Sequence, residues 1–458
     1  MRHVKRRPDF AIRVVRPRYQ AGRGFDDIGY FPSDRVGGDQ TLWSDQLLSY
    51  SFSEQLASVN TEFTFAVTPE LDWNGKSWMD KIRPRDVAVF TEFGVVRYVG
   101  VVMRIRYTGR MDDTPNRSIT ISGMGLGGIL SSFKLVLDQH VYQYNSTAES
   151  ENRKFIAALQ GALSVEDSFR QVMISAYQSF IRLMNAVGNL DSEGGVGVVL
   201  SRYLDYETGI DPDIKPQFPV HFNLYSAGAN DIWSIWEGMV QRPIHELFGR
   251  WNAETDMYQI VFRQAPFNSE DWASLPIHEM DPLWVKSVEV GLSDDDIYTF
   301  FSSSLPGSGI SREIALGVGE YAQQAEVDRE KWALYGYRPM EMTFKYFDRD
   351  FLADFTGADS LMGEMNRMVR GWYEKNAEFL NGTVEMMTVP DAYVRIGERL
   401  RYLNGEFYVE GTSRSWTYGG PMTTNLTVTR GYQYDDSGEY IGPIRNLGRN
   451  LKRSEVMS

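Results

Sequence analysis

Two strand-rich segments of this chain follow the same plan, and this internal repeat constrains its fold more than any other feature. The first segment covers residues 61–125 and the second covers residues 382–431. Each contains a strand that ends in proline, a short strand opened by an acidic residue, a Tyr-Val pair before a glycine, and a β-branched strand that ends in glycine. Such a repeat predicts one antiparallel β-domain that is used twice. Convergence is the alternative, because hairpin sheets reuse Gly, Tyr and Val.

The landmarks of the repeat match in pairs along the two segments. They are Pro69 with Pro390, Asp86 with Glu398, and the pair Tyr98-Val99 before Gly100 with the pair Tyr408-Val409 before Gly411. In the first segment, alternating apolar residues place the strands near Ser58–Thr68, Val87–Phe90, Val95–Met103 and Ser118–Ser122.

The residues between and around the repeats have a different character. Apolar residues at three- and four-residue steps from Phe169 to Val187 predict an amphipathic helix. Asn230 is expected to cap a helix over 230–241, ahead of a hairpin built from Ile244–Trp251 and Met257–Phe262. Residues 23–41 are rich in Gly and Asp and form either a long hairpin tip or an insertion.

These patterns divide the chain into consecutive parts. We expect a basic N-terminal arm (1–22), a first β-barrel domain (8–135), a helical insertion (136–215), a small α/β linker domain with a hairpin (216–282), a second β-barrel domain (283–433) that carries helices over 314–334 and 357–379, and a polar C-terminal tail (434–458).

Charge is distributed unevenly along the chain. The net charge is −14, yet residues 1–23 hold eight basic residues against Asp9, a net of +7, so the rest carries −21. An acidic body repels duplex DNA, which argues against sequence-specific nucleic-acid binding. We expect the basic arm to dock on an acidic surface of a neighbouring subunit.

Composition excludes several classes of site. The chain has no cysteine and five histidines, none of them in a metal-ligand spacing. Disulfide scaffolds, thiol catalysis, zinc ribbons and Fe–S clusters are therefore excluded, and no metal or cofactor is predicted. No secretory signal follows the basic N-terminus, and no apolar run approaches the roughly 18 residues of a membrane span. Assembly in a cytoplasm is expected.

Three motifs resemble catalytic or ligand-binding signatures. Gly123, Gly125 and Gly128 fit a dinucleotide fingerprint, but no βαβ unit surrounds them, so we expect a turn into a short helix at Ile129–Phe133. Asp436-Ser437-Gly438 resembles an aspartic-protease triplet in a polar tail, where a turn is expected. Ser293-Asp294-Asp295-Asp296 could hold a hard cation but lacks alternating ligand spacing, and a turn or helix cap fits equally well.

No nucleophile motif or phosphate-binding loop occurs either. Sequence alone cannot bring two of the 61 carboxylates together as a glycosidase pair, although that chemistry stays open. We therefore predict no catalytic, cofactor-binding or metal-binding residue.

Four stretches between about residue 230 and residue 431 carry a family resemblance. The stretches are MYQIVFRQAPFNSEDWASLP (257–276), VKSVEVGLSDDDIYTFFSSSLP (285–306), KWALYGYRPMEM (331–342) and YVRIGERLRYLNGEFYVEGTSRSWTYGGPMTTNLTVTRG (393–431). They resemble the tail hub proteins at the baseplate centre of bacteriophages, which share a fold with the hub part of the type VI secretion spike and of related contractile injection machines. Residues 1–60 and 140–215 match poorly, and no fused lysozyme or peptidase is expected after residue 435.

The resemblance implies a fold and a function. The fold would be α+β and β-dominated, with two related tail-tube-like antiparallel β-barrel domains plus helical and small α/β insertions. Hubs of this family are homotrimers, so three chains would present a pseudo-sixfold ring to the hexameric tail tube or distal tail protein, with the trimeric central spike or fibre protein below. The tape measure protein and other baseplate subunits would be further partners, and the virion tail would be the location.

Two other classes of function remain open from the sequence. One is a carbohydrate-active enzyme or lectin, which would need a cleft of carboxylates and tryptophans. The other is a cell-wall hydrolase of the tail tip.

Overall fold

The computed structural model describes residues 9–18, 24–32, 47–69, 71, 75–109, 117–132, 196–205, 231–238, 240–304, 325–343, 366–390 and 392–445. The expected helix at 169–187 lies outside these residues, as does most of the helical insertion. So do residues 1–8 of the basic arm and 446–458 of the tail.

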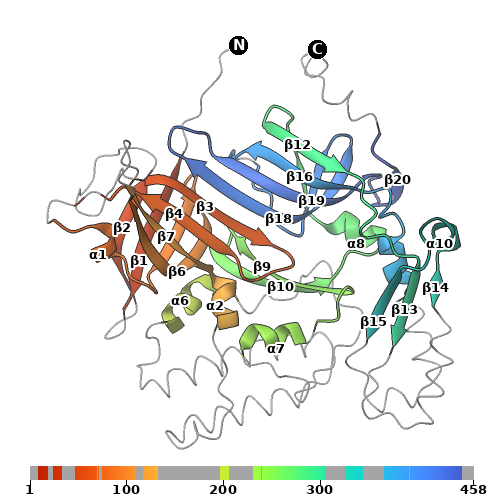
Figure 1. The fold of residues 1–458 in the computed structure, drawn as a ribbon, viewed down its shortest axis with the longest axis horizontal. Coiled ribbons are helices and arrows are strands. Elements are labelled where there is room, and N and C mark those ends of the chain that lie inside the picture. Colours follow the sequence, from red (N-terminus) through yellow and green to blue (C-terminus); the bar gives the residue numbers. More distant parts are fainter. Residues whose placement is uncertain are drawn as a thin grey trace, which may run out of the picture.

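The described residues are β-rich, and most of their strands belong to one large sheet (Figure 1). Along its main path the strands lie side by side in the order β12 (Val285–Gly291), β16 (Leu380–Met387), β19 (Thr423–Tyr434), β18 (Gly405–Thr417), β3 (Leu47–Gln55), β4 (Glu62–Val67), β7 (Arg117–Gly125), β6 (Val95–Gly109), β5 (Val87–Glu92), β1 (Phe10–Pro17) and β2 (Phe25–Pro32). Off this path, β17 (Arg399–Tyr402) pairs with β18 and β11 (Ile277–Glu279), and β20 (Tyr440–Gly442) pairs with β19.

The two repeated segments have the same strand order. The first runs β4-β7-β6-β5 and the second runs β16-β19-β18-β17, and every neighbouring pair is antiparallel. The predicted reuse of one strand arrangement is therefore present. Among the described strands, no hydrogen-bonded pair closes either half on itself, and the halves are joined to each other instead. Closure into two barrels stays a prediction.

Asp86 and Glu398 occupy equivalent positions in the two halves. The backbone oxygen of Asp86 accepts a hydrogen bond from the Val102 N–H at 2.8 Å, and that of Glu398 accepts one from the Val409 N–H at 3.0 Å. The residue before each carboxylate has a left-handed backbone, with φ of 79° at Arg85 and 76° at Gly397. The match of these two acidic residues is therefore confirmed.

A bulge marks the same place in both halves. The strand register slips by one residue directly after Val102 and directly after Val409, which leaves Met103 and Glu410 without an opposite residue. Val409 thus corresponds to Val102. The Tyr-Val-Gly match was wrong by three positions, because it set Val409 against Val99.

Hairpin length explains this error. The first half turns between Glu92 and Val95, whereas the second turns earlier, between Tyr402 and Gly405. A further bulge between Phe90 and Thr91 adds to the difference. The two Tyr-Val motifs lie at the same distance from their turns, since Tyr98 comes three residues after Val95 and Tyr408 three after Gly405. The equivalent of Val409 nevertheless lies three residues further along β6, at Val102.

Each half has its own buried core, because alternate residues of its strands face inward. In β4, Phe63, Phe65 and Val67 are buried while their neighbours are not. The first core is rich in aromatic rings and also receives Trp416, from β18 of the second half, whose ring centroid is 4.6 Å from that of Phe10. The second core is mainly aliphatic, with Val384, Leu400, Val409, Leu426 and Val428 fully buried.

A small sheet of β8 (Leu204–Asp205), β10 (Met257–Gln264) and β9 (His245–Asn252) packs beside the first half. The predicted hairpin of this region is confirmed as β9 and β10. Three helices contribute to the same core: α2 (Leu126–Ser132), α6 (Val196–Tyr203) and α7 (Ile232–Gly238). Asn230, the predicted cap, lies outside the described residues. Asp231 caps α7, because its carboxylate accepts from the Ser234 N–H at 2.8 Å.

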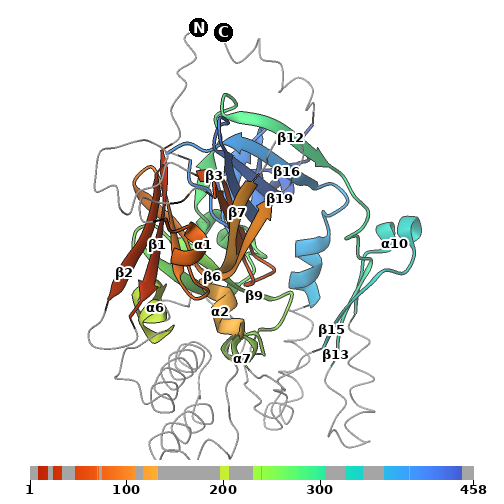
Figure 2. The same ribbon diagram turned by 60° about the vertical axis from the view of Figure 1, so that its left-hand side comes forward.

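A separate three-stranded sheet lies within the range predicted for the second barrel. It consists of β14 (Glu326–Val327), β13 (Phe300–Ser304) and β15 (Pro339–Thr343), and Figure 2 shows β13, β15 and α10 (Arg329–Tyr335) to one side of the large sheet. Residues 314–324 of the helix predicted over 314–334 lie outside the described residues. The helix prediction was wrong at Glu326–Val327, which form the strand β14, and correct at 329–334, which belong to α10. Of the helix predicted over 357–379, residues 366–373 are helical, residues 374–378 form turns instead, and residues 357–365 lie outside the described residues. The remaining short helices are α1 (Trp78–Lys81) and α8 (Ser269–Ser274).

The basic N-terminal segment is partly built into the sheet. Phe10–Pro17 is β1, and residues 25–32 pair with it as β2, so part of the Gly/Asp-rich loop is one strand of a hairpin. Acidic residues of this chain already pair with the arginines: Arg13 with Asp27 at 2.6 Å, Arg16 with Asp86 at 2.7 Å and Arg18 with Asp26 at 2.7 Å. These three arginines of the described part of the arm, residues 9–18, thus have partners within the chain.

Candidate subunit interface

The two halves of the sheet meet edge to edge at β18 and β3. The first part of β18 pairs with β17, and the second part pairs on the same edge with β3, from Gly411 opposite Gln55 to Thr417 opposite Ser49. The contact continues past the strand end, where the Tyr418 N–H donates to the Leu48 carbonyl at 2.8 Å. One continuous sheet thus passes from one half into the other.

A buried ion pair lies across this junction. Arg414 Nη1 is 2.6 Å from Glu92 Oε2, and the Tyr50 hydroxyl donates to Glu92 Oε1 at 2.9 Å. The Tyr393 ring packs against two cations, since it lies 4.4 Å from the Arg414 guanidinium and 3.9 Å from that of Arg97. The pairing leaves the Glu92 carboxylate compensated in the interior.

Glu54 adds a titratable group on the other strand of the junction. Its carboxylate is buried and accepts from the Trp251 N–H at 3.1 Å. Burial raises the pKa of Glu54 to about 7, and the charge of Arg414 nearby offsets only part of that effect. The junction therefore changes its charge near neutral pH.

Glu398 belongs to a second buried cluster close by. Its carboxylate oxygens are 2.6 Å from His278 Nε2, 2.5 Å from Arg395 and 3.5 Å from Arg250. Burial opposes its ionisation, but these three groups outweigh burial and hold the pKa of Glu398 below its usual value. The cluster joins β11, β9 and the start of β17.

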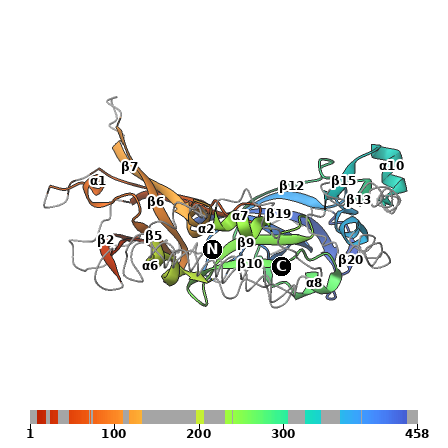
Figure 3. The same cartoon turned by 90° about the horizontal axis from the view of Figure 1, so that it is seen from below.

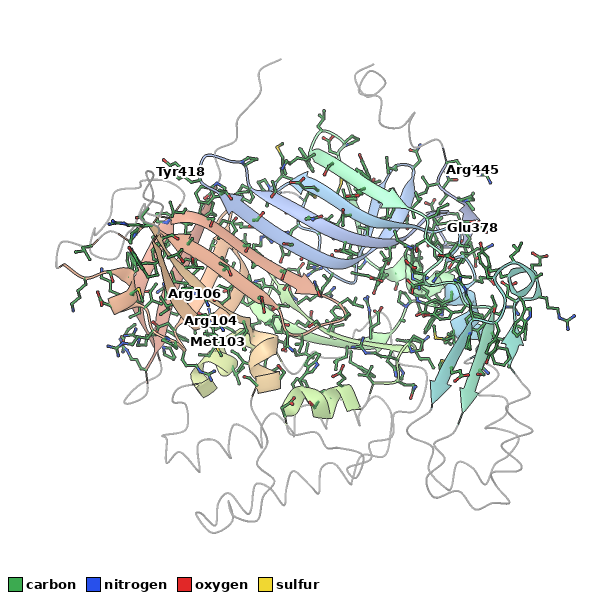
Figure 4. The ribbon with its side chains drawn as sticks, in the orientation of Figure 1. Met103, Arg104, Arg106, Glu378, Tyr418 and Arg445 are labelled. Carbon is green, nitrogen blue, oxygen red and sulfur yellow. The ribbon has the colours of Figure 1, made fainter. Side chains whose placement is uncertain are left out.

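The first half presents the equivalent edge to solvent. Beyond Val102, β6 pairs only with β7 among the described strands, so the other edge of Arg104–Gly109 has no strand beside it there. Met103 and Tyr107 are 38% and 49% exposed, and Figure 4 shows Met103, Arg104 and Arg106 together on β6. Seen from below, β6 and β7 extend out of the body at one end (Figure 3).

The second half also ends in an open edge. In the described part of the chain, β12 pairs with β16 alone. Val288 and Val290 are half-buried against the second core, while Glu289 points to the other side and is exposed. Leu292, just past the strand, is 64% exposed. Apolar groups at an exposed strand edge are typical of a surface that another strand covers.

The glycine motif is used for packing. Gly123 and Gly125 lie in β7, and Gly128 lies in α2, which begins at Leu126 rather than at Ile129. A Cβ on Gly123 would lie 2.0 Å from the Val101 carbonyl oxygen, and one on Gly125 would lie 2.1 Å from Thr61 Oγ1. These glycines let β7 approach its neighbours closely, which is a structural requirement.

The acidic motifs form turns. The Asp435 carboxylate accepts from the N–H groups of Ser437 and Glu439, both at 2.9 Å, in the connection between β19 and β20. The Ser293 hydroxyl donates to Asp295 at 2.7 Å, and Arg338 pairs with Asp294 at 3.0 Å. Among the described residues, no three His, Asp or Glu side chains gather as they would around a metal ion.

Sequence reasoning did not find the candidate interface. It located β6 and the region of β12, but not that both have an open edge, because strand neighbours far apart in sequence are not encoded locally. The apolar positions of β6 near 105 and 107 and of β12 near 288 and 290 were the available signal. As for membranes, no helix within the described ranges has both the length and the apolar character needed to cross one.

Comparison with known proteins gives matches in structure only. No family model and no curated protein matches the chain. A tail protein from Neisseria meningitidis has 11% identity and a TM-score of 0.48, over 92% of this chain and 96% of that one. The 43 kDa tail protein of prophage MuSo2 from Shewanella oneidensis has 9% identity and a TM-score of 0.49, over 96% and 100%. The prophage tail protein gp18 from Listeria monocytogenes has 9% identity and a TM-score of 0.40, over 92% and 94%. The solved structures to which this chain is similar thus include phage and prophage tail proteins.

Proposed function

We propose that this protein is the structural hub of a phage tail baseplate or a related injection machine. Three chains form a pseudo-sixfold ring that joins the hexameric tail tube, or a distal tail protein, to the trimeric central spike or fibre. The ring lines the channel through which DNA leaves, and the protein acts without catalysis. The family resemblance of residues 257–276, 285–306, 331–342 and 393–431 supplies this assignment.

One structural observation supports the ring most directly. A single chain holds two strand arrangements of the same order, already joined edge to edge by β18 and β3. Among the described strands, β6 beyond Val102 and β2 leave open edges in the first half, and β12 leaves one in the second. A chain that carries two different complementary edges associates head to tail, and head-to-tail contacts close into rings when the rotation allows it. The open edges would otherwise promote aggregation.

The number of chains follows from the resemblance. Each chain would fill two adjacent positions of a six-position ring, so three chains close it. The tube protein would meet the sixfold side, and the spike or fibre would dock on the threefold side. Tape measure protein and other baseplate subunits would be further contacts of the virion tail.

Charge suits a channel for DNA. Each chain has a net charge of −14, so the assembled ring is strongly acidic. Like charges prevent DNA from adsorbing to the channel wall, and the DNA can then pass without being held.

The experiment is a mass measurement combined with imaging. Light scattering after size-exclusion chromatography is expected to give a mass of three chains, and negative-stain images are expected to show a ring with six similar lobes. A monomer or a dimer at every concentration tested would contradict the hub. A zymogram on peptidoglycan and a reducing-sugar assay should both be negative; turnover that depends on a pair of carboxylates would support an enzyme of the tail tip.

A further inference from the structure

Within the chain, β12 is the counterpart of β3. β3 borders β4 with Phe52 opposite Phe63, and β12 borders β16 with Val290 opposite Gly382. Phe63 and Gly382 are themselves equivalent, as the strand pairing shows. In the first half Phe63 lies opposite Gly123, which lies opposite Val102 on its other side. In the second half Gly382 lies opposite Val428, which lies opposite Val409, the equivalent of Val102.

Bulges confirm the alignment of the two edge strands. The β3 register slips between Leu47 and Ser49, and the β12 register slips between Val285 and Ser287. With Phe52 set against Val290, these two irregularities coincide. The two halves are therefore equivalent over five strands, and β3 and β12 have the same place in each.

The internal junction then defines a second junction that one chain cannot make by itself. In the first junction, residues 411–417 of β18 pair with β3. The equivalent residues of β6 begin at Arg104, and they have no strand beside them among the described residues. The equivalent of β3 is β12, whose outer edge is likewise open there.

We propose that β6 of one chain pairs antiparallel with β12 of the next copy, in the register that β18 and β3 already show. Transfer of that register sets Ile105 opposite Leu292, Tyr107 opposite Val290 and Thr108 opposite Glu289. The inference rests on the proposed ring and specifies how its subunits are joined.

The side chains of the two edges agree with this register. Ile105 packs against the first core, and Val288 and Val290 pack against the second. By strand alternation Tyr107 lies on the same face as Ile105, and Leu292 on the same face as Val290, but both of these side chains are exposed. Pairing puts Tyr107 against Val290 and Leu292 against Ile105, which covers apolar surface on one face. A slip of one residue would place Ile105 and Tyr107 opposite Gly291 or a polar residue, and this apolar contact would be lost.

Charge on the opposite face is complementary as well. Arg106 and Glu289 are both exposed and both point away from the cores. In the proposed register Glu289 is the diagonal neighbour of Arg106, at a distance that long side chains bridge. The contact brings a cation of one chain to an anion of the next.

Cysteine cross-linking tests the register, because the natural chain contains no cysteine. Tyr107→Cys combined with Val290→Cys should give covalent dimers and trimers under mild oxidation, since opposite residues of antiparallel strands have Cα atoms within disulfide range. Tyr107→Cys combined with Glu289→Cys is the matched control, because its two thiols lie on opposite faces. Single-cysteine variants control for random collisions.

Charge reversal gives an independent measurement of the same contact. Arg106→Glu and Glu289→Arg should each weaken association on the order of five- to tenfold, and the double variant should recover most of the loss. Arg117→Glu, an exposed arginine on the neighbouring strand β7, should leave association unchanged. Thermal melts of each variant separate a lost contact from a lost fold.

The outcomes distinguish the pairing from the ring. A trimer that cross-links in the control combination, or whose double charge variant is no better than the single ones, overturns the pairing and leaves the hub. A protein that remains monomeric at every concentration overturns both. Covalent trimers only from the 107–290 combination support both.

Discussion

Arg414 in the second half of the sheet lies 2.6 Å from the carboxylate of Glu92 in the first half, and both side chains are almost completely buried. The two residues are 322 positions apart in sequence. This ion pair therefore forms only when the halves meet at β18 and β3.

Removing one member of that pair should destabilise the whole sheet. Arg414→Ala leaves the Glu92 carboxylate buried without its ion-pair partner, although the Tyr50 hydroxyl still donates to it, and we expect a loss of about 3–5 kcal/mol in the free energy of unfolding. Urea denaturation followed by tryptophan fluorescence measures it. The double variant Arg414→Met with Glu92→Leu should lose less than Arg414→Ala alone; an additive loss would show that the pair is not coupled.

Glu54 should make stability depend on pH. Its pKa is raised from 4.5 to about 7 in the folded state, so between these values the folded chain binds more protons than the unfolded chain. The contribution of Glu54 to stability is then largest at low pH and is lost as the pH rises through about 7.

Glu54→Gln tests this directly, since the amide oxygen can still accept from the Trp251 N–H. The variant should be more stable than the natural chain at pH 8, by about 1–3 kcal/mol, and nearly equal to it at pH 5. The exposed Glu62→Gln on β4 is the control and should leave the pH profile unchanged. Equal profiles for Glu54→Gln and the natural chain would contradict the assignment.

Arg85 and Gly397 give a matched pair of backbone variants, because both have a positive φ. A Cβ on Gly397 would lie 2.7 Å from Phe248 Cζ and 2.8 Å from Arg263 Nη2, so Gly397→Ala should cost about 2–3 kcal/mol. Arg85→Gly relieves the same backbone strain and should change stability by less than about 1 kcal/mol. Thermal unfolding of both variants would measure the difference, and similar melting temperatures would refute it.

The first residues of the chain are expected to contribute to assembly through charge. Deletion of residues 2–7 removes Arg2, Lys5, Arg6 and Arg7, which lie outside the described residues. Association should weaken more at low salt than at high salt, because salt screens charge contacts. Sedimentation velocity at two salt concentrations is the measurement, and an equal loss at both would rule out an electrostatic role.

The sequence by itself determined the local elements of this protein. Alternation predicted β4 and β7, and a run of apolar residues around a polar turn predicted the β9–β10 hairpin, because these signals are contained in neighbouring residues. The equivalence of Asp86 and Glu398 was also visible in sequence. It could be found because each residue opens a short strand directly after a backbone turn.

Tertiary structure decided the register and the edges. The two hairpins differ in length and in bulges, so Val409 corresponds to Val102 and not to the similar-looking Val99. The burial of Glu54 and the pairing of Glu92 with Arg414 depend on contacts between distant strands. The equivalence of β3 and β12 is likewise a matter of which strands are neighbours, and hydrogen bonds between distant segments leave no pattern in either segment alone.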